Sequence, residues 1–298
     1  MPQQPPDGML IRSYGTSTAR AVAYTSMAML AFAGNSIICR LALRDGAIDP
    51  ASFTAVRLIS GAVVLLLIFQ LTRRGDSVRR HGGWISALML FLYAICFSYA
   101  YISLSAGAGA LILFGFVQAT MITIGVWSGD RPRIVEWLGW SVAFAGLVWL
   151  VLPGVAAPEP IGASLMAIAG IAWGIYSIRG RAESDALAST ASNFTLSLAM
   201  VLAMLAITYS GTDLSGRGIL LAIVSGALTS GVGYVIWYAA LIYLSAMQAA
   251  LVQLSVPAIA TAGGVLLLAE SLSLRLLVSS ALVLGGIGLA LLRKTPEL

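Results

Sequence analysis

Long apolar stretches alternate with short polar ones along almost the whole chain. Ten such stretches occur, and each is close to the roughly 20 residues that an α-helix needs to cross the hydrocarbon core of a bilayer. The alternation typical of strands in a membrane barrel is missing. We therefore predict an all-α integral membrane protein with ten transmembrane helices, at residues 19–42, 50–71, 83–104, 107–127, 134–152, 161–179, 188–209, 218–241, 245–269 and 271–292.

The composition agrees with a chain that lives in lipid. Hydrophobic residues make up 59% of the sequence and charged residues 10%, with a mean hydropathy of +0.93, whereas a soluble domain carries roughly 25% charged residues. The net charge is +5. Because the basic residues gather between the apolar stretches, orientation in a bilayer explains them better than binding to nucleic acid, and we expect no nucleic-acid partner.

The basic residues also predict the orientation of the helices. If the amino end lies in the cytoplasm, twelve of the Lys and Arg residues fall on the cytoplasmic side, and only Arg40, Arg44, Arg217 and Arg275 fall on the other. Since cytoplasmic loops carry the excess of Lys and Arg, we place both termini in the cytoplasm. Residues 1–18 contain three prolines and no apolar run long enough for a signal peptide, so we expect a disordered cytoplasmic tail there.

The chain also repeats itself after 140 residues. Leu104-Ser105-Ala106 aligns with Leu244-Ser245-Ala246, and Ala110-Leu111 aligns with Ala250-Leu251. This periodicity predicts two five-helix units. Because five is an odd number, the second unit enters the bilayer from the opposite face, which makes the two units an inverted pair.

We place these units at residues 19–152 and 161–292. Inverted pairs are a common architecture of secondary transporters, which bind substrate near the midplane at the interface of the repeats. Rocking of the two units then opens the site to either side in turn. The repeat therefore indicates a transporter that works by alternating access.

These features resemble the drug/metabolite transporter superfamily, and within it the EamA-type ten-helix exporters. The resemblance lies in the two Leu-Ser-Ala turns, in Pro257, and in Glu270-Ser271-Leu272-Ser273 before a Gly-rich last helix. It covers residues 19–292 and is more specific for fold than for substrate. The first half departs from the family pattern, with Gly129-Asp130-Arg131-Pro132 where many members have Glu. More narrowly, the chain is similar to the bacterial exporters of aromatic amino acids and methionine.

The resemblance implies a central cavity bounded by the first, third, fourth, sixth, eighth and ninth helices. Independently, polar and aromatic residues within apolar stretches concentrate on these six helices. Small residues that allow close packing lie instead on the fifth and tenth helices, at Gly139, Gly146, Gly285, Gly286 and Gly288. The candidate substrate-binding residues on the cavity helices are Asn35, Tyr99, Gln118, Trp173, Tyr176, Tyr234, Trp237 and Gln253.

Each of these residue types also has a structural interpretation. Pro257 removes the helical partner of the Gln253 carbonyl, which leaves either an acceptor for a substrate ammonium group or a plain kink. Gln118 can equally bond a neighbouring helix, and the aromatic residues can equally form packing core. Arg57, the one charge well inside an apolar stretch, can hold a substrate carboxylate. Its helix is not expected to be central, so we favour a structural role for Arg57.

The sequence lacks the residue patterns of common membrane enzymes. No Asp or Glu lies deep in an apolar stretch, so no carboxylate proton relay is visible. The single histidine, His81, lies in a basic loop, and Cys39 and Cys96 lie in different stretches. Neither H-E-x-x-H nor G-x-x-x-x-G-K-[ST] occurs. We therefore predict no enzymatic activity, no catalytic residues, no metal and no cofactor.

Taken together, these patterns predict a bacterial inner-membrane exporter of amino acids, aromatic and other large neutral ones among them. Its partners are then the small-molecule substrate and the lipid bilayer. An exporter of drugs or other amphipathic metabolites is the alternative. The oligomeric state stays open, with a monomer among the options.

Overall fold

The computed structural model describes residues 7–72, 82–129, 131–152, 154, 157–181, 183, 185–208, 214–244, 249 and 252–291. These residues form helices, and their single extended pairing is an isolated bridge between Ile48 and Leu214. The helices are α1 (Asp7–Arg44), α2 (Pro50–Thr72), α3 (Trp84–Ala100), α4 (Ala106–Trp127), α5 (Ile134–Val151), α6 (Pro160–Arg181), α7 (Ala186–Thr208), α8 (Gly216–Ile223), the π-helical η3 (Val224–Val232), α9 (Gly233–Leu241), α11 (Ser255–Leu268) and α12 (Leu274–Leu291).

Helices α8, η3 and α9 follow one another without a break and form one continuous helix. Seven helices of the described chain are long and apolar enough to span a membrane, namely α1 from Ala19 onwards, α2, α4, α5, α6, α7 and the continuous α8–α9 helix. The other apolar helices, α3, α11 and the described part of α12, are shorter. The structure thus confirms an all-helical membrane architecture, while helix length alone supports seven of the ten predicted crossings.

Two predicted boundaries differ from the structure. Helix α1 begins at Asp7 and so runs through most of the segment that we assigned to a disordered tail. The last proline of that segment is Pro6, and beyond it the backbone N–H groups are free to form helical bonds. Helix α11 begins only at Ser255, whereas we expected a helix from residue 245. Of that first part, residues 245–248, 250 and 251 lie outside the described residues.

Polar residues at the helix starts explain several of the boundaries. Asp49 directly precedes Pro50, the first residue of α2, and its carboxylate accepts a hydrogen bond from the Ser52 N–H. Proline suits this position because its missing N–H would have no helical partner there. The side chains of Ser105, Asp185, Ser215 and Ser273 cap α4, α7, α8 and α12 in the same way. The turns between the apolar stretches are thus encoded locally.

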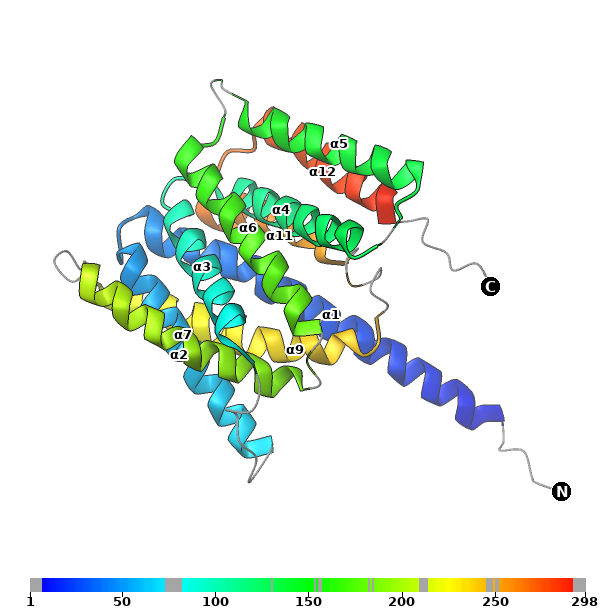
Figure 1. The fold of residues 1–298 in the computed structure, drawn as a ribbon, viewed down its shortest axis with the longest axis horizontal. Coiled ribbons are helices and arrows are strands. Elements are labelled where there is room, and N and C mark those ends of the chain that lie inside the picture. Colours follow the sequence, from blue (N-terminus) through cyan, green and yellow to red (C-terminus); the bar gives the residue numbers. More distant parts are fainter. Residues whose placement is uncertain are drawn as a thin grey trace.

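The helices of the two halves pack in matched pairs. Helix α2 packs on α7, α4 on α11 and α5 on α12, so that each helix contacts its counterpart in the other half. Helix α3 packs on α6. The counterparts of these two helices in the other half, α9 and α1, pack on each other as well. Figure 1 shows α5 and α12 side by side at one edge of the molecule, with α2 and α7 on the other side. Exchanging the halves leaves this pattern unchanged, as a two-fold repeat requires.

Close glycine contacts hold α5 against α12. A Cβ atom on Gly286 would lie 2.5 Å from the carbonyl oxygen of Gly139 and 2.6 Å from the backbone nitrogen of Ala143. Gly146 packs in the same way against Leu282 and Val283, so the two helices run antiparallel. Gly285 and Gly288, which we also expected in the interface, face open space. The tenth helix therefore uses one of its three glycines for this contact.

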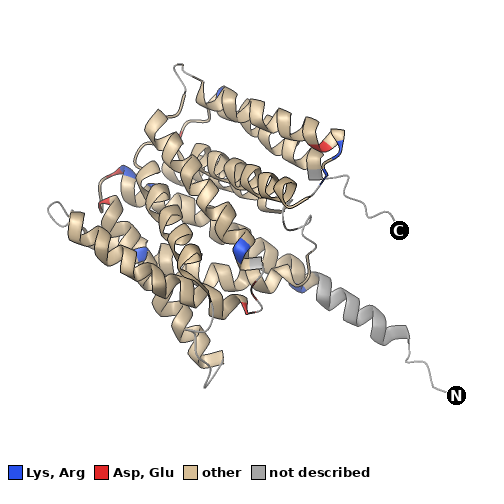
Figure 2. Ribbon diagram, viewed as in Figure 1, with Lys and Arg blue, Asp and Glu red and all other residues tan. Residues whose placement is uncertain are grey.

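Charged residues are sparse along the helices. Figure 2 shows the described Lys, Arg, Asp and Glu residues gathered largely at helix ends and in turns, with long uncharged ribbon between them. Arg57 is an exception, because it lies within α2 rather than at a helix end and its exposed fraction is only 2%. An ionised residue at such a depth needs partners within the protein.

The α5–α12 contact predicts a difference between two neighbouring glycines. Gly286→Ala should lower the stability of the protein by about 1–3 kcal/mol, because the added methyl group overlaps backbone atoms of α5. Gly285→Ala is the matched control and should be neutral or slightly stabilising, because the space beside it is open and alanine favours helix. Thermal unfolding of the detergent-solubilised variants measures the difference. Equal midpoints for the two variants would contradict the packing described.

Candidate functional site

Two adjoining cavities lie where helices of both halves meet. The first, here the Asn35 cavity, is small and has room for the centres of water-sized spheres over about 20 Å³. The second, here the Gln253 cavity, is larger, at about 40 Å³ by the same measure. The Asn35 cavity is lined by Phe32, Asn35, Ser36, Tyr93, Phe97, Leu113, Phe114, Trp173, Thr229 and Tyr234, and the Gln253 cavity by Phe32, Met121, Trp173, Tyr176, Ser177, Tyr234, Trp237, Tyr238, Leu241 and Gln253.

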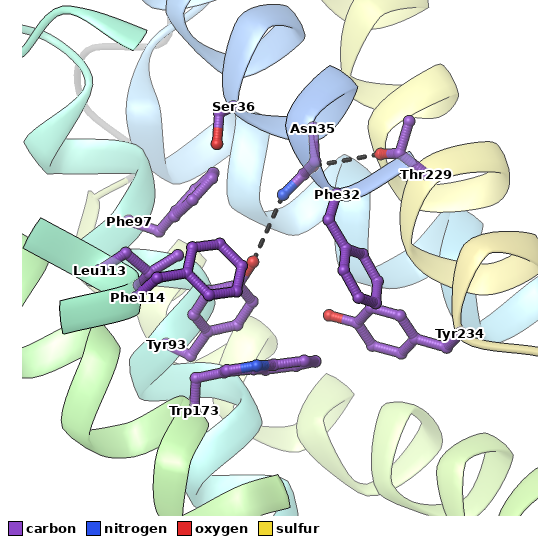
Figure 3. A pocket seen from close by; sticks show the side chains of 10 residues that line it. All are labelled: Phe32, Asn35, Ser36, Tyr93, Phe97, Leu113, Phe114, Trp173, Thr229 and Tyr234. Carbon is purple, nitrogen blue, oxygen red and sulfur yellow. Dashed lines mark hydrogen bonds between the residues drawn. The ribbon is translucent and has the colours of Figure 1, made fainter. Parts of the chain in front are cut away.

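Three aromatic residues, Phe32, Trp173 and Tyr234, line both cavities and so form a partition between them. The ring centroids of Trp173 and Tyr234 are 5.1 Å apart, and those of Phe32 and Tyr234 are 6.0 Å apart in an edge-on arrangement. Figure 3 shows Trp173 across the bottom of the Asn35 cavity, with Phe32 and Tyr234 beside it. A solute that passes from one cavity to the other has to displace these rings.

A hydrogen-bonded network centred on Asn35 forms the polar wall of the first cavity. The Asn35 amide nitrogen donates to the Tyr93 hydroxyl over 3.3 Å, and its oxygen accepts from the Ser225 and Thr229 hydroxyls over 2.7 and 3.2 Å. Figure 3 shows Asn35 between Tyr93 and Thr229. Each partner of the Asn35 amide group is thus a hydroxyl group on another helix.

The residues that bond Asn35 from the second half belong to the π-helical segment η3. Its wider turns carry Ser225, Thr229 and Ser230 towards α1 and α2. Gly226, in the same segment, allows a close backbone approach to Arg57, where a Cβ atom would overlap the Arg57 carbonyl oxygen. Short π-helical segments are rare and frequently lie at functional sites. Here the segment joins the second half to the centre of the first.

Arg57 lies directly behind this wall. Its Nη2 donates to the Tyr93 hydroxyl over 3.0 Å, and its Nε donates to the Ser230 hydroxyl over 3.3 Å. The guanidinium carbon is 5.1 Å from the ring centroid of Tyr93 and 5.0 Å from that of Phe97. The structural role favoured for Arg57 stays a prediction, and the structure adds that Arg57 contacts two residues that line the cavity. Its position was missed because α2 itself contributes no lining residue.

The structure brings six of the eight candidate residues to the cavities. Asn35 lines the first cavity, Tyr176, Trp237 and Gln253 line the second, and Trp173 and Tyr234 line both. Tyr99 and Gln118 line neither of these cavities, although Gln118 is buried.

Among the residues that we did not select, Tyr93 and Thr229 are the most informative. Both take part in the Asn35 network and both line the first cavity. The available signal for Thr229 was the row of hydroxyl residues at positions 225, 229 and 230 in an otherwise apolar stretch. The spacing of four residues between Ser225 and Thr229 places these two side chains on one face of a helix.

A cluster of polar groups lies at the end of the bundle beyond the Asn35 cavity. The Glu270 carboxylate accepts from the Arg40 Nε over 3.3 Å and from the Ala106 N–H at the start of α4 over 2.9 Å. Arg40 also donates to the carbonyl oxygens of Tyr101 and Ile102 over 2.9 and 2.7 Å. These contacts tie α1, α4 and the end of α11 together. Arg40 follows the cavity residue Ser36 by four positions, or about 6 Å of helix.

The backbone at the end of α11 aims Glu270 into this cluster. Ala269 has a left-handed conformation with φ of 51°, and the Glu270 N–H donates to the Gly264 carbonyl oxygen over 3.0 Å. A side chain on Gly264 would overlap the Glu270 carboxylate. A left-handed alanine costs roughly 1–2 kcal/mol, which shows how strongly the surrounding contacts hold the turn.

The opposite end of the bundle is different in character. The Gln253 cavity reaches Leu241, the last residue of α9, and Gln253, which precedes α11. Pro257 lies in the first turn of α11, where a proline is tolerated. Residues 252 and 253 are helical and residue 254 is a turn before α11, so the predicted loss of a helical partner at Gln253 coincides with a break between two helical segments. Within the described chain no group of three or more His, Cys, Asp or Glu is arranged to hold a metal ion.

Comparison with known proteins decides the family. A model of the EamA-like transporter family matches residues 19–152 and again residues 160–292. The chain belongs to the EamA-like transporter family. It is built from two EamA units and is a multi-pass membrane protein of a family that transports small molecules and is not a family of enzymes. The predicted resemblance to this family is thereby confirmed.

Two further similarities agree with the EamA assignment. A protein of Pseudomonas aeruginosa named "Uncharacterized protein PA1977" is 49% identical over 272 residues, which cover 91% of this chain and 94% of that protein. A crystal structure of a protein superposes with a TM-score of 0.65 at 20% identity, covering 93% of this chain and 99% of the other. The second similarity concerns the fold alone.

The Asn35 network predicts a graded loss of stability. Asn35→Leu should destabilise the protein by about 1–3 kcal/mol, because it leaves buried hydroxyl groups of α3 and η3 without their partner. Thr229→Val removes one hydroxyl and leaves the Ser225 bond intact, so it should cost less. Thermal unfolding in detergent compares the two variants. A larger loss for Thr229→Val than for Asn35→Leu would contradict the central place of Asn35.

Proposed function

We propose that this EamA protein exports amino acids, aromatic and other large neutral ones, across the bacterial inner membrane. In this proposal all ten helices cross the bilayer, the two halves are inverted, and both termini lie in the cytoplasm. Helices α3 and α11 are short, at 17 and 14 residues, so they cross with the help of their flanking turns. The excess of Lys and Arg on one side of the predicted topology supports the orientation.

One observation carries the proposal. The two cavities form a path along the interface of the halves, walled by aromatic rings and interrupted by a few fixed polar groups. Sites for small molecules have this composition, because apolar walls bind the body of a ligand and the polar groups fix its orientation. A large neutral amino acid has a matching apolar side chain and polar backbone. Aromatic rings also attract organic cations, so an exporter of cationic drugs is the second candidate.

Alternating access requires each end of this path to open in turn. The Arg40–Glu270–Ala106 cluster closes the end of the path beyond the Asn35 cavity. In the proposed orientation this end of the path faces the outside of the cell. The Gln253 cavity reaches the opposite end, where substrate would enter from the cytoplasm. We infer that the described conformation is closed to the outside, and that export requires the polar cluster to separate.

Transport by the purified protein is the direct test. In liposomes without an ion gradient, radiolabelled phenylalanine should accumulate by exchange with saturable kinetics, competed by tryptophan and methionine. Trp237→Ala should raise the half-saturation concentration roughly tenfold, because it removes an aromatic wall of the Gln253 cavity. Trp127→Ala, at a side chain that is 85% exposed, is the matched control and should change little. Transport of an organic cation without any amino acid would favour the second candidate.

Opening of the outer end can be measured separately. In a variant without Cys39 and Cys96, Ser36→Cys places a thiol in the Asn35 cavity. Glu270→Gln should speed its labelling by a membrane-impermeant maleimide roughly tenfold or more, because the Arg40 contact loses its charge-assisted bond, worth about 1.5–3 kcal/mol. Asp45→Asn removes the exposed pair with Arg44 and should have little effect. Equal labelling rates in the two variants would show that Glu270 does not hold this end closed.

A further inference from the structure

Arg57 carries a buried positive charge that the described protein does not neutralise. Its side chain is held by two hydroxyl groups, Ser230 and Tyr93, and the Nη1 atom has no hydrogen-bond partner among the described residues. Two ion pairs of the described residues, Arg40–Glu270 and Arg44–Asp45, do not involve Arg57. A guanidinium taken out of water without an anion is costly. Such a residue in a transporter points to a role in substrate binding.

The charge faces the Asn35 cavity through its wall. The guanidinium carbon is 5.1 Å from the ring centroid of Tyr93 and 5.0 Å from that of Phe97, and both residues line the cavity. Arg57 does not line the cavity itself, so it reaches a ligand there through these two neighbours. In surroundings of low dielectric constant, a charge at this range acts strongly on a ligand.

Tyr93 links the positive charge of Arg57 to the cavity, because it bonds Arg57 and lines the cavity. Its hydroxyl oxygen accepts hydrogen bonds from Arg57 Nη2 and from Asn35 Nδ2, which occupy both of its lone pairs. Its own hydrogen then remains available as a donor. A donation from a cation polarises the hydroxyl group and strengthens that donor. The cavity thus presents an electropositive O–H group, which suits a negatively charged acceptor.

The Gln253 cavity has the opposite character. Its wall consists largely of the rings of Tyr176, Trp237 and Tyr238, together with the neutral amide of Gln253. Within the described chain no Asp or Glu lines either cavity. An organic cation would meet the field of Arg57 without a compensating carboxylate. A molecule with a carboxylate at one end and an apolar group at the other matches both cavities.

We propose that the Asn35 cavity is a carboxylate-binding site, in which the Tyr93 hydroxyl donates to the substrate and Arg57 acts as a positioning residue that polarises Tyr93. This assignment rests on the proposed transport function and narrows its substrates. Amino acids and other apolar carboxylates bind across the partition after Phe32, Trp173 and Tyr234 have moved apart, with the carboxylate beside Tyr93 and the apolar group in the Gln253 cavity. Cations that lack a carboxylate are rejected.

The test compares three ligands that share one phenyl group. Phenylalanine carries a carboxylate and an ammonium group, 3-phenylpropionate carries only the carboxylate, and phenylalaninamide carries only the ammonium group. In liposomes, the first two should compete for uptake of labelled phenylalanine, and phenylalaninamide should compete at least tenfold less well. In detergent, 3-phenylpropionate should raise the melting temperature, and phenylalaninamide should not.

Variants then assign the residues. Tyr93→Phe keeps the ring and removes the donor, so it should raise the half-saturation concentration for phenylalanine roughly tenfold and narrow the preference over phenylalaninamide. Arg57→Lys should keep part of that preference, and Arg57→Gln should lose it. Tyr24→Phe is the matched control, because Tyr24 packs on Tyr243 and lines neither cavity, and the preference should be unchanged.

The outcomes separate the two proposals. Equal competition by phenylalanine and phenylalaninamide, or an unchanged preference in Tyr93→Phe, would overturn the carboxylate site and leave amino acid transport standing. Stabilisation by 3-phenylpropionate without any movement of phenylalanine would support the carboxylate site and overturn the amino acid proposal. Failure of 3-phenylpropionate to stabilise the protein would overturn the carboxylate site, whatever is transported.

Discussion

A bilayer offers no water to the polar groups within it, so each one has to be satisfied by the protein itself. In this protein, two buried polar side chains satisfy this constraint by bonding to the Tyr93 hydroxyl. Arg57 of α2 and Asn35 of α1 both donate to it, and Asn35 in turn accepts from hydroxyl groups of η3. Three helices of the first half are thereby joined to one helix of the second. The network shapes both the interface of the halves and the wall of the first cavity.

The aromatic residues build on this polar centre. Tyr93 contacts Trp173 at a centroid distance of 4.8 Å, and Trp173 continues to Tyr176 and Tyr234. The polar network therefore positions the first ring of a connected aromatic cluster that extends through both cavities. The same few contacts thus serve stability and the substrate path together.

Much of the fold could be predicted from the sequence, because apolar stretches of membrane length and a repeat of 140 residues are local, readable signals. The polar caps at Asp49 and Ser105 belong to the same class. The site could be predicted only in part. Six candidate residues line the cavities, but Tyr99 and Gln118 lie on the right helices and do not line either cavity. Helix choice follows from pattern, whereas helix rotation depends on tertiary packing.

Arg57 shows why the remainder could not be predicted. Its helix was judged peripheral, and α2 indeed contributes no lining residue to the two cavities. The side chain is long enough to contact Tyr93 and Phe97, and Gly226 permits the close approach of η3 to the Arg57 backbone. A π-helical turn then supplies Ser230 as its partner. None of these features has a sequence signature of its own, since a π-helix and an α-helix are compatible with the same apolar pattern.

The π-helical segment has a further consequence for movement. A π-helix is wound more widely than an α-helix. In η3, the Ser225 hydroxyl bonds Asn35 and the Ser230 hydroxyl bonds Arg57. If those bonds are released, the same residues can rewind as an ordinary α-helix. Rewinding turns α9 about its axis relative to α8 and lengthens the helix between them. The second half therefore contains a segment that can change its helical form within one of its longest helices, at the contact with the first half.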